Sequence, residues 1–226
     1  MKQKKWDAAY WILAVLPLAA ALPIYFLIPA TVQLSPEIHV PSGRAGIFVL
    51  PSLNLAFAFL FHFLLKGLEA SFRRKVSETG PPPDTSRFFS LLRLYMIAFF
   101  DVMCFAGFYG YYILDPGGPE AIDLMCRAAA AMLGAGLILS ARYLPGCTKR
   151  SVLALRWSYT EKNDQVWRLT HRLASRLFFA TGALVILCAI AASGLRAIIL
   201  AGLSCVLLFL TLYTYSRKLY EDSFKP

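Results

Sequence analysis

The residues best suited to chemistry in this chain of 226 residues lie in one basic and aromatic stretch, residues 149–176. The stretch contains Trp157 and Trp167 and the run Thr170-His171-Arg172. Indole and guanidinium groups suit the headgroup layer of a membrane, and an unperturbed imidazole titrates near neutral pH. The stretch therefore predicts a polar site at a membrane border, with anionic lipid headgroups as one partner.

The period of residues 164–176 is that of a helix. Trp167 and Leu173 fall on one apolar arc. A second arc carries an arginine at every fourth position, namely Arg168, Arg172 and Arg176. Asn163 or Asp164 can cap such a helix, because a side-chain oxygen accepts hydrogen bonds from the free N–H groups of the first turn. We predict an interfacial helix just before the fifth membrane span.

The order of residues in this stretch resembles the signature of the SdpI family of bacterial membrane proteins. The family's motif runs roughly as an Asn, then Gly-Ile-Arg-Thr-Pro-Trp-Thr, then Val-Trp-x-x-Thr-His-Arg. The second half is intact here as Val166-Trp167 and Thr170-His171-Arg172. In the first half, Arg156 and Thr160 match, whereas Arg150, Ala154 and Trp157-Ser158-Tyr159 replace Asn, Gly and Thr-Pro-Trp.

This resemblance implies a protein of the bacterial plasma membrane that gives immunity to a membrane-active peptide toxin of the sporulation-delaying type. In the family's type member, a soluble repressor is also captured at the membrane. We expect no enzyme activity, cofactor or direct nucleic-acid binding, because catalytic motifs are missing and the basic residues lie at membrane borders. The resemblance implies one functional cluster: Arg156, Thr160, Trp167, Thr170, His171 and Arg172.

The composition excludes an ordinary soluble domain. Hydrophobic residues make up 58% of the chain and charged residues 16%, against about half and about a quarter in typical soluble domains. Several apolar runs reach the roughly 20 residues that cross a bilayer as a helix. We predict an all-α polytopic bundle of six transmembrane helices, at about 6–28, 44–65, 87–114, 121–143, 173–193 and 197–215.

The predicted organisation is a two-helix amino-terminal hairpin (1–68), a loop (69–86) and a four-helix domain (87–226). Nineteen Lys or Arg residues lie on one predicted face, in segments 1–5, 66–87, 142–176 and 216–226. Only Arg44 and Arg196 flank the spans on the other face. By the positive-inside rule, both termini and the basic stretch are cytoplasmic.

Polar residues within spans are costly and are candidates for function. The candidates are Asn54 and His62 in the second span, Asp101 in the third and Arg127 in the fourth. Asp101 and Arg127 differ in depth by roughly 9 Å, which suits either a structural ion pair or part of a proton or ligand site. The second possibility leads to an alternative function, a small transporter or channel-like protein that uses Asp101, Arg127 and Asn54.

Several residues also have a simpler interpretation. Trp157, Tyr159 and Trp167 could be membrane-border anchors, and His171 could hydrogen-bond a neighbouring loop. A catalytic His171 lacks the motifs of known enzyme classes around it. His39 is expected to be an ordinary loop residue. The five cysteines show no spacing typical of zinc sites, so we expect small buried residues and no metal.

Overall fold

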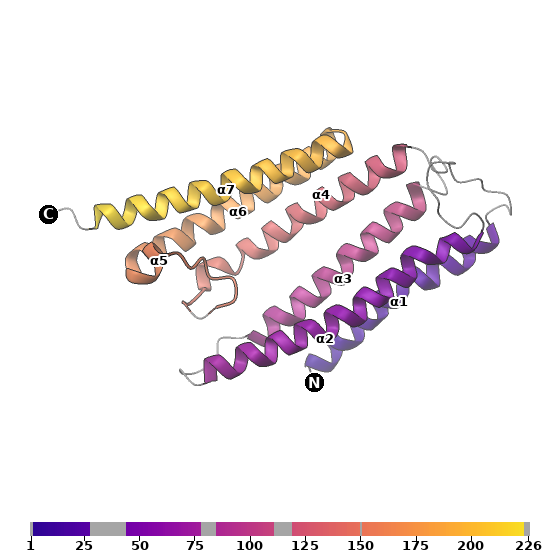
Figure 1. Cartoon of the computed structure of the whole chain (residues 1–226), viewed down its shortest axis with the longest axis horizontal. Helices are drawn as coiled ribbons and strands as arrows, with labels where there is room; N and C mark the ends of the chain where they lie inside the picture. The colour runs from indigo at the N-terminus through magenta and orange to yellow at the C-terminus, as the bar shows by residue number, and fades with distance from the viewer. Residues whose placement is uncertain (1, 28–43, 78–84, 111–118, 150, 224–226) are drawn as a thin grey trace. The chain divides into compact units, whose positions relative to one another are not determined.

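The computed structural model describes residues 2–27, 44–77, 85–110, 119–149 and 151–223. These residues are almost entirely helical, without strands (Figure 1). The long helices are α1 (Lys2–Leu27), α2 (Val49–Ser77), α3 (Thr85–Tyr109), α4 (Pro119–Ala141), α6 (Asp164–Ala191) and α7 (Gly194–Asp222). Short helical segments lie at η1 (Arg44–Phe48), η3 (Leu144–Gly146) and α5 (Ser158–Lys162).

The predicted membrane spans are confirmed as helices. Among the described residues, six helices are long and apolar enough to cross a membrane. Many of their large apolar side chains are exposed, among them Phe26, Phe63 and Ile190, as expected for surfaces that face lipid. The fold class predicted from the sequence, an all-α polytopic membrane bundle, is therefore confirmed.

Two helices extend beyond their predicted limits. Helix α2 continues to Ser77, into the predicted loop. The predicted interfacial helix at residues 164–176 and the fifth span form one continuous helix, α6, because no Gly or Pro interrupts the chain between Asp164 and Thr181. Helix α1 passes through Pro17 and Pro23 without a break. The predicted loop residue His39 lies outside the described residues.

The amino-terminal unit, Met1–Ala129, is compact. Its helices α1, α2 and α3 pack against one another in all three pairings. Its core contains Tyr10, Ala14, Ala58 and Ile97, followed along α1 by a second apolar cluster of Ala21, Ile47 and Phe108. Helix α3 thus packs with the first two helices in this unit.

The carboxy-terminal unit, Ala130–Pro226, contains the α6–α7 hairpin and the last turns of α4. Two glycines allow α4 and α6 to touch through their backbones. A Cβ on Gly134 would lie 2.6 Å from the carbonyl oxygen of Gly182, and a Cβ on Gly182 would lie 2.6 Å from that of Gly134. The small residues of α4 therefore serve close helix packing, as predicted.

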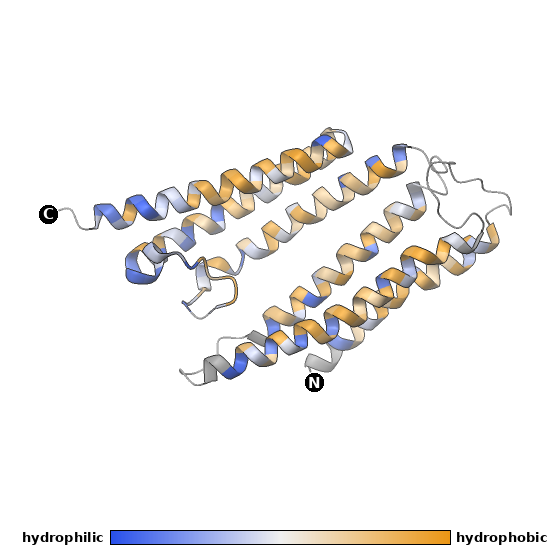
Figure 2. Cartoon of the chain, in the orientation of Figure 1, coloured by the Kyte–Doolittle hydropathy of each residue, from blue (hydrophilic) through white to orange (hydrophobic). Residues whose placement is uncertain are grey.

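The hydropathy of each helix varies along its length (Figure 2). In the carboxy-terminal unit, hydrophilic residues gather at α5, the first turns of α6 and the last turns of α7 (Figure 2). These three parts are in contact, since α5 packs against both α6 and α7. They form the polar end of this unit and contain the basic stretch.

Candidate functional site

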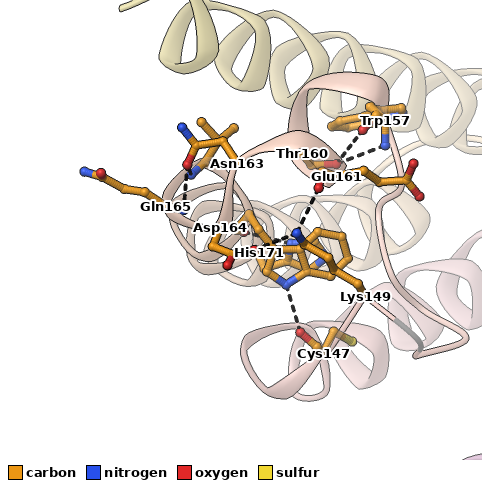
Figure 3. Close-up of polar contacts among 11 residues, drawn as sticks. Cys147, Lys149, Trp157, Thr160, Glu161, Asn163, Asp164, Gln165 and His171 are labelled. Carbon is orange, nitrogen blue, oxygen red and sulfur yellow. Dashed lines mark hydrogen bonds and ion pairs between the residues drawn. The ribbon is translucent and has the colours of Figure 1, made fainter. Parts of the chain in front are cut away.

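The segment between α4 and α6, residues 147–163, folds back onto the start of α6, and we call it the basic loop (Figure 3). Asn163 ends the loop and caps α6, as its Oδ1 accepts from the backbone N–H groups of Gln165 at 2.8 Å and Val166 at 3.3 Å. The predicted cap is therefore confirmed at Asn163. Such caps stabilise a helix by about 1 kcal/mol.

Thr160 closes the turn of the basic loop from inside. Its side chain is fully buried, and its Oγ1 accepts a hydrogen bond from the N–H of Trp157 at 3.0 Å. The same hydroxyl lies 2.9 Å from the carbonyl oxygen of Leu155 and 3.0 Å from that of Trp157, and can donate to either. Thr160 thereby satisfies backbone groups that the turn would otherwise leave without partners.

His171 joins the loop to α6. Its ring is 2% exposed, and Nε2 accepts a hydrogen bond from the backbone N–H of Leu155 at 3.2 Å. An acceptor at Nε2 places the ring proton on Nδ1, which then donates to the carbonyl oxygen of Trp167 at 2.9 Å. Both ring nitrogens are therefore engaged in the fold by a neutral imidazole.

Trp167 stacks on His171, with ring centroids 4.1 Å apart and an angle of 25° between the rings. Its indole is 6% exposed, and Nε1 donates to the carbonyl oxygen of Cys147 at 3.0 Å. Trp167 therefore anchors the start of the basic loop, with its indole buried in the fold. Burial raises the pKa of the Cys147 thiol, which donates to the carbonyl oxygen of Tyr143 at 3.3 Å.

The other two aromatic residues of the loop pack against α7. Trp157 meets Tyr213 edge-on, with ring centroids 5.8 Å apart. Tyr159 contacts Tyr213 at 5.8 Å and Tyr220 at 5.5 Å. The loop is thus held from one side by α6 and from another by α7.

The remaining residues of the predicted cluster divide between the surface and the interior. Arg156 is exposed and donates to the carbonyl oxygen of Ser151 at 3.2 Å. Arg172 is exposed and forms no hydrogen bond or ion pair with any described residue. Thr170 is fully buried, and its hydroxyl has no partner among the described residues.

Lys149 contributes to the site although sequence reasoning assigned it no contact. Its Nζ lies 2.6 Å from Oδ1 of Asp164 and donates to the carbonyl oxygen of Glu161 at 2.8 Å (Figure 3). The contact closes the basic loop across its two ends. This contact could have been predicted from a lysine at the start of the loop and an acidic residue in the first turn of the helix that follows.

A model of the SdpI/YfhL protein family matches residues 147–214, from the start of the basic loop into α7. This part of the chain is similar to the SdpI/YfhL family. The resemblance predicted from the Trp-x-x-Thr-His-Arg order is thereby confirmed. No curated protein and no solved structure matches the chain.

Within the SdpI/YfhL region, Trp167, Thr170 and His171 lie on the buried face of α6. This shared face follows from the spacing of the three residues, since residues at i, i+3 and i+4 of a helix lie on one side. Arg168, Arg172 and Arg176 all lie on exposed positions of the same helix. The motif thus combines a buried half that fixes the loop and an exposed half that is basic.

The intramembrane polar residues lie outside the SdpI/YfhL match. Asn54 Nδ2 donates to Asp101 Oδ1 at 2.9 Å, and both side chains are buried. Arg127 instead pairs with Asp123, one helical turn away on α4, with Nε and Oδ2 2.6 Å apart. The predicted ion pair between Asp101 and Arg127 is wrong, because each residue has a nearer polar partner.

His62 is buried in the amino-terminal unit, whereas the next residue, Phe63, is exposed. His62 is 7% exposed and packs against the rings of Tyr10 at 5.6 Å and Trp11 at 5.0 Å. Its Nδ1 has no partner among the described residues. His62 is thus part of the interior of the three-helix unit rather than of its lipid-facing surface.

Proposed function

We propose that this SdpI/YfhL family protein confers immunity to a membrane-active peptide toxin from the bacterial plasma membrane. The observation that carries the proposal is the basic loop, because the family match begins with it and the intact half of the motif fixes it to α6. An ordered polar surface next to membrane-spanning helices suits recognition of a peptide that acts on the membrane.

The buried and exposed halves of the motif have separate roles. Thr160, Trp167 and His171 hold the basic loop in place through hydrogen bonds to its backbone. Arg156 and Arg172 are exposed and supply the positive charge that a partner contacts. Arg168 and Arg176 face the anionic headgroups of the lipid.

The partner at this surface is a peptide toxin, a soluble repressor, or each in turn. Capture of a repressor when toxin is present is the signalling role that the family's type member suggests. Both partners would meet the polar end of the carboxy-terminal unit. The role is one of binding and not of catalysis, which is supported by the engagement of both His171 ring nitrogens within the fold.

The orientation follows from the distribution of charge, with both termini and the basic loop in the cytoplasm. Single cysteines at Ser158 in α5 and at Leu195 at the start of α7 test it, since both positions are exposed. In intact cells without the native cysteines, an impermeant thiol reagent is expected to label Leu195→Cys only. Labelling of Ser158→Cys alone would reverse the orientation.

The transporter alternative required Asp101, Arg127 and Asn54 to act as one site. Arg127 pairs with Asp123, whereas Asp101 pairs with Asn54. The three residues therefore do not share a hydrogen-bonded cluster, and no observation favours this alternative over immunity.

The test is protection of a susceptible bacterium that lacks its own immunity protein against a sporulation-delaying-type peptide toxin. The parent chain is expected to restore growth, and His171→Ala, Trp167→Ala and Arg172→Ala are expected to lose protection at matched membrane abundance. Arg168→Ala is the matched control, an exposed arginine one turn before Arg172, and is expected to protect like the parent. Absence of protection by the parent, or equal protection by all variants, would overturn the proposal.

A further inference from the structure

The interior of the amino-terminal unit contains a buried amide and carboxyl in direct contact. Asn54 of α2 is 1% exposed and Asp101 of α3 is 5% exposed. Asn54 Nδ2 donates to Asp101 Oδ1 at 2.9 Å and lies 3.4 Å from the carbonyl oxygen of Ala14 in α1. The pair thus joins all three helices near the middle of their membrane spans.

Two of the four polar side-chain atoms of the pair take part in no hydrogen bond among the described residues. Asn54 Oδ1 and Asp101 Oδ2 are both buried, and neither has a partner among the described residues. Both atoms are acceptors when the carboxyl is ionised, so they lack a donor between them. Buried polar atoms without partners are uncommon in folded proteins and indicate a missing proton, ion or ligand.

Of the titratable and charged groups nearest the pair, Tyr10, Cys104 and Arg93 are engaged elsewhere, whereas His62 Nδ1 has no partner among the described residues. Tyr10 of α1 donates its hydroxyl to the carbonyl oxygen of Ala58 at 2.5 Å. Cys104 of α3 donates to the carbonyl oxygen of Leu50 at 3.5 Å. His62 of α2 and Arg93 of α3 each lie about two helical turns from the pair, and Arg93 pairs with Asp7 at 3.3 Å.

No cation therefore balances a negative charge on Asp101, which forms no ion pair with any described residue. An isolated carboxylate in such a place carries a penalty of several kcal/mol. One proton removes this charge. It also turns Asp101 Oδ2 into a donor, for which Asn54 Oδ1 is the free acceptor of the neighbouring amide. Acid and amide then pair through two hydrogen bonds.

We propose that Asn54 and Asp101 form a proton-binding site in the membrane interior, occupied at neutral pH. This inference is independent of toxin immunity and of the SdpI/YfhL region. The proton comes from water and binds as Asp101 changes from carboxylate to carboxylic acid. It exchanges with the side of the membrane on which Asp7 lies, since the polar side chains Tyr10, His62 and Arg93 occupy that side of the pair.

The described part of the chain places an apolar barrier on the opposite side of the pair. Ala21, Ile47 and Phe108 are buried there in an apolar cluster, with Ile47 and Phe108 about two helical turns beyond Asn54 and Asp101. Apolar packing offers no hydrogen-bonded route for a proton. The site therefore binds a proton without conducting one across the membrane.

Infrared difference spectroscopy of the full chain in lipid nanodiscs tests occupancy. At pH 7 the C=O stretch of a protonated carboxyl is expected, absent in Asp101→Asn and unchanged by added sodium ions. Asn54→Val is expected to keep the band and shift it to higher frequency, because the acid loses its hydrogen-bonded partner. This second variant tests the site even if Asp101→Asn does not fold.

Two results would overturn occupancy of the site by a proton. In the first, neither variant changes a carboxylic acid band at pH 7. In the second, the band disappears when sodium is added, which would assign the site to a metal cation. Closure is tested with proteoliposomes that contain a pH-sensitive dye. The parent chain is expected to dissipate an imposed pH gradient no faster than empty vesicles. Faster dissipation that Asp101→Asn abolishes would replace the closed site with a conducting path.

Discussion

The basic loop of the carboxy-terminal unit and the Asn54–Asp101 pair of the amino-terminal unit are both built from buried polar residues, but they differ in how fully these residues are bonded. Both ring nitrogens of His171 and the hydroxyl of Thr160 have partners within the loop or α6. Asn54 and Asp101 each leave one buried oxygen without a partner. A bonded network fixes the backbone around it, whereas an incompletely bonded one is suited to binding something further.

Helix α6 supports the basic loop, and close packing of α6 on α4 at Gly182 keeps this support rigid. An added Cβ would lie 2.6 Å from the carbonyl oxygen of Gly134, a contact that neither backbone can avoid. We expect Gly182→Ala to destabilise the chain by about 3 kcal/mol. Denaturation in mixed micelles measures the change.

Gly202 provides the control, because a Cβ there meets no atom within 4 Å. Gly202→Ala is expected to leave stability equal or slightly higher, since alanine favours a helix over glycine. Equal stability of the two alanine variants would show that α4 and α6 do not approach through their glycines.

Two buried threonines compare a bonded hydroxyl directly with an unbonded one. Thr160→Val keeps the shape of the side chain but leaves the N–H of Trp157 without its acceptor. We expect a loss of about 2 kcal/mol. Thr170→Val removes a hydroxyl that has no partner among the described residues, and is expected to cost little. The same denaturation measurement compares them, and a larger loss for Thr170→Val would reverse our assignment of the two hydroxyls.

A double-mutant cycle sharpens the assignment of partners in the amino-terminal unit. Asn54→Leu and Asp101→Leu are expected to show a coupling of about 1 kcal/mol, because their side chains share a hydrogen bond. Asp101→Leu and Arg127→Leu are expected to be additive within about 0.5 kcal/mol, because Arg127 pairs with Asp123. Strong coupling in the second cycle would restore the ion pair between Asp101 and Arg127.

The sequence predicts the parts of this molecule that depend on local periodicity. Apolar length defined the six spans, and helical spacing placed Trp167, Thr170 and His171 on one face. The partner of Arg127 was also within reach of such reasoning, since Asp123 lies at the favourable spacing of four residues. Similar depth in the membrane, which favoured Asp101 as the partner of Arg127, was less informative than this spacing.

Contacts between distant segments could not be predicted in the same way. Asn54 and Asp101 are 47 residues apart, and hydropathy gives no register between two helices. The partners of His171 and Trp167 in the basic loop are backbone groups of Leu155 and Cys147. Every residue carries such groups, so residue types alone do not identify which of them a side chain binds.

The central claim is that the buried half of the motif acts by holding the basic loop, and the amide of Leu155 reports on it directly. Its N–H donates to His171 Nε2, so we predict that His171→Ala speeds hydrogen exchange in residues 151–157 about tenfold, equivalent to the loss of one buried hydrogen bond. Arg172→Ala, which is also expected to lose toxin protection, should leave this exchange unchanged. Equal exchange in His171→Ala and the parent chain would contradict the account.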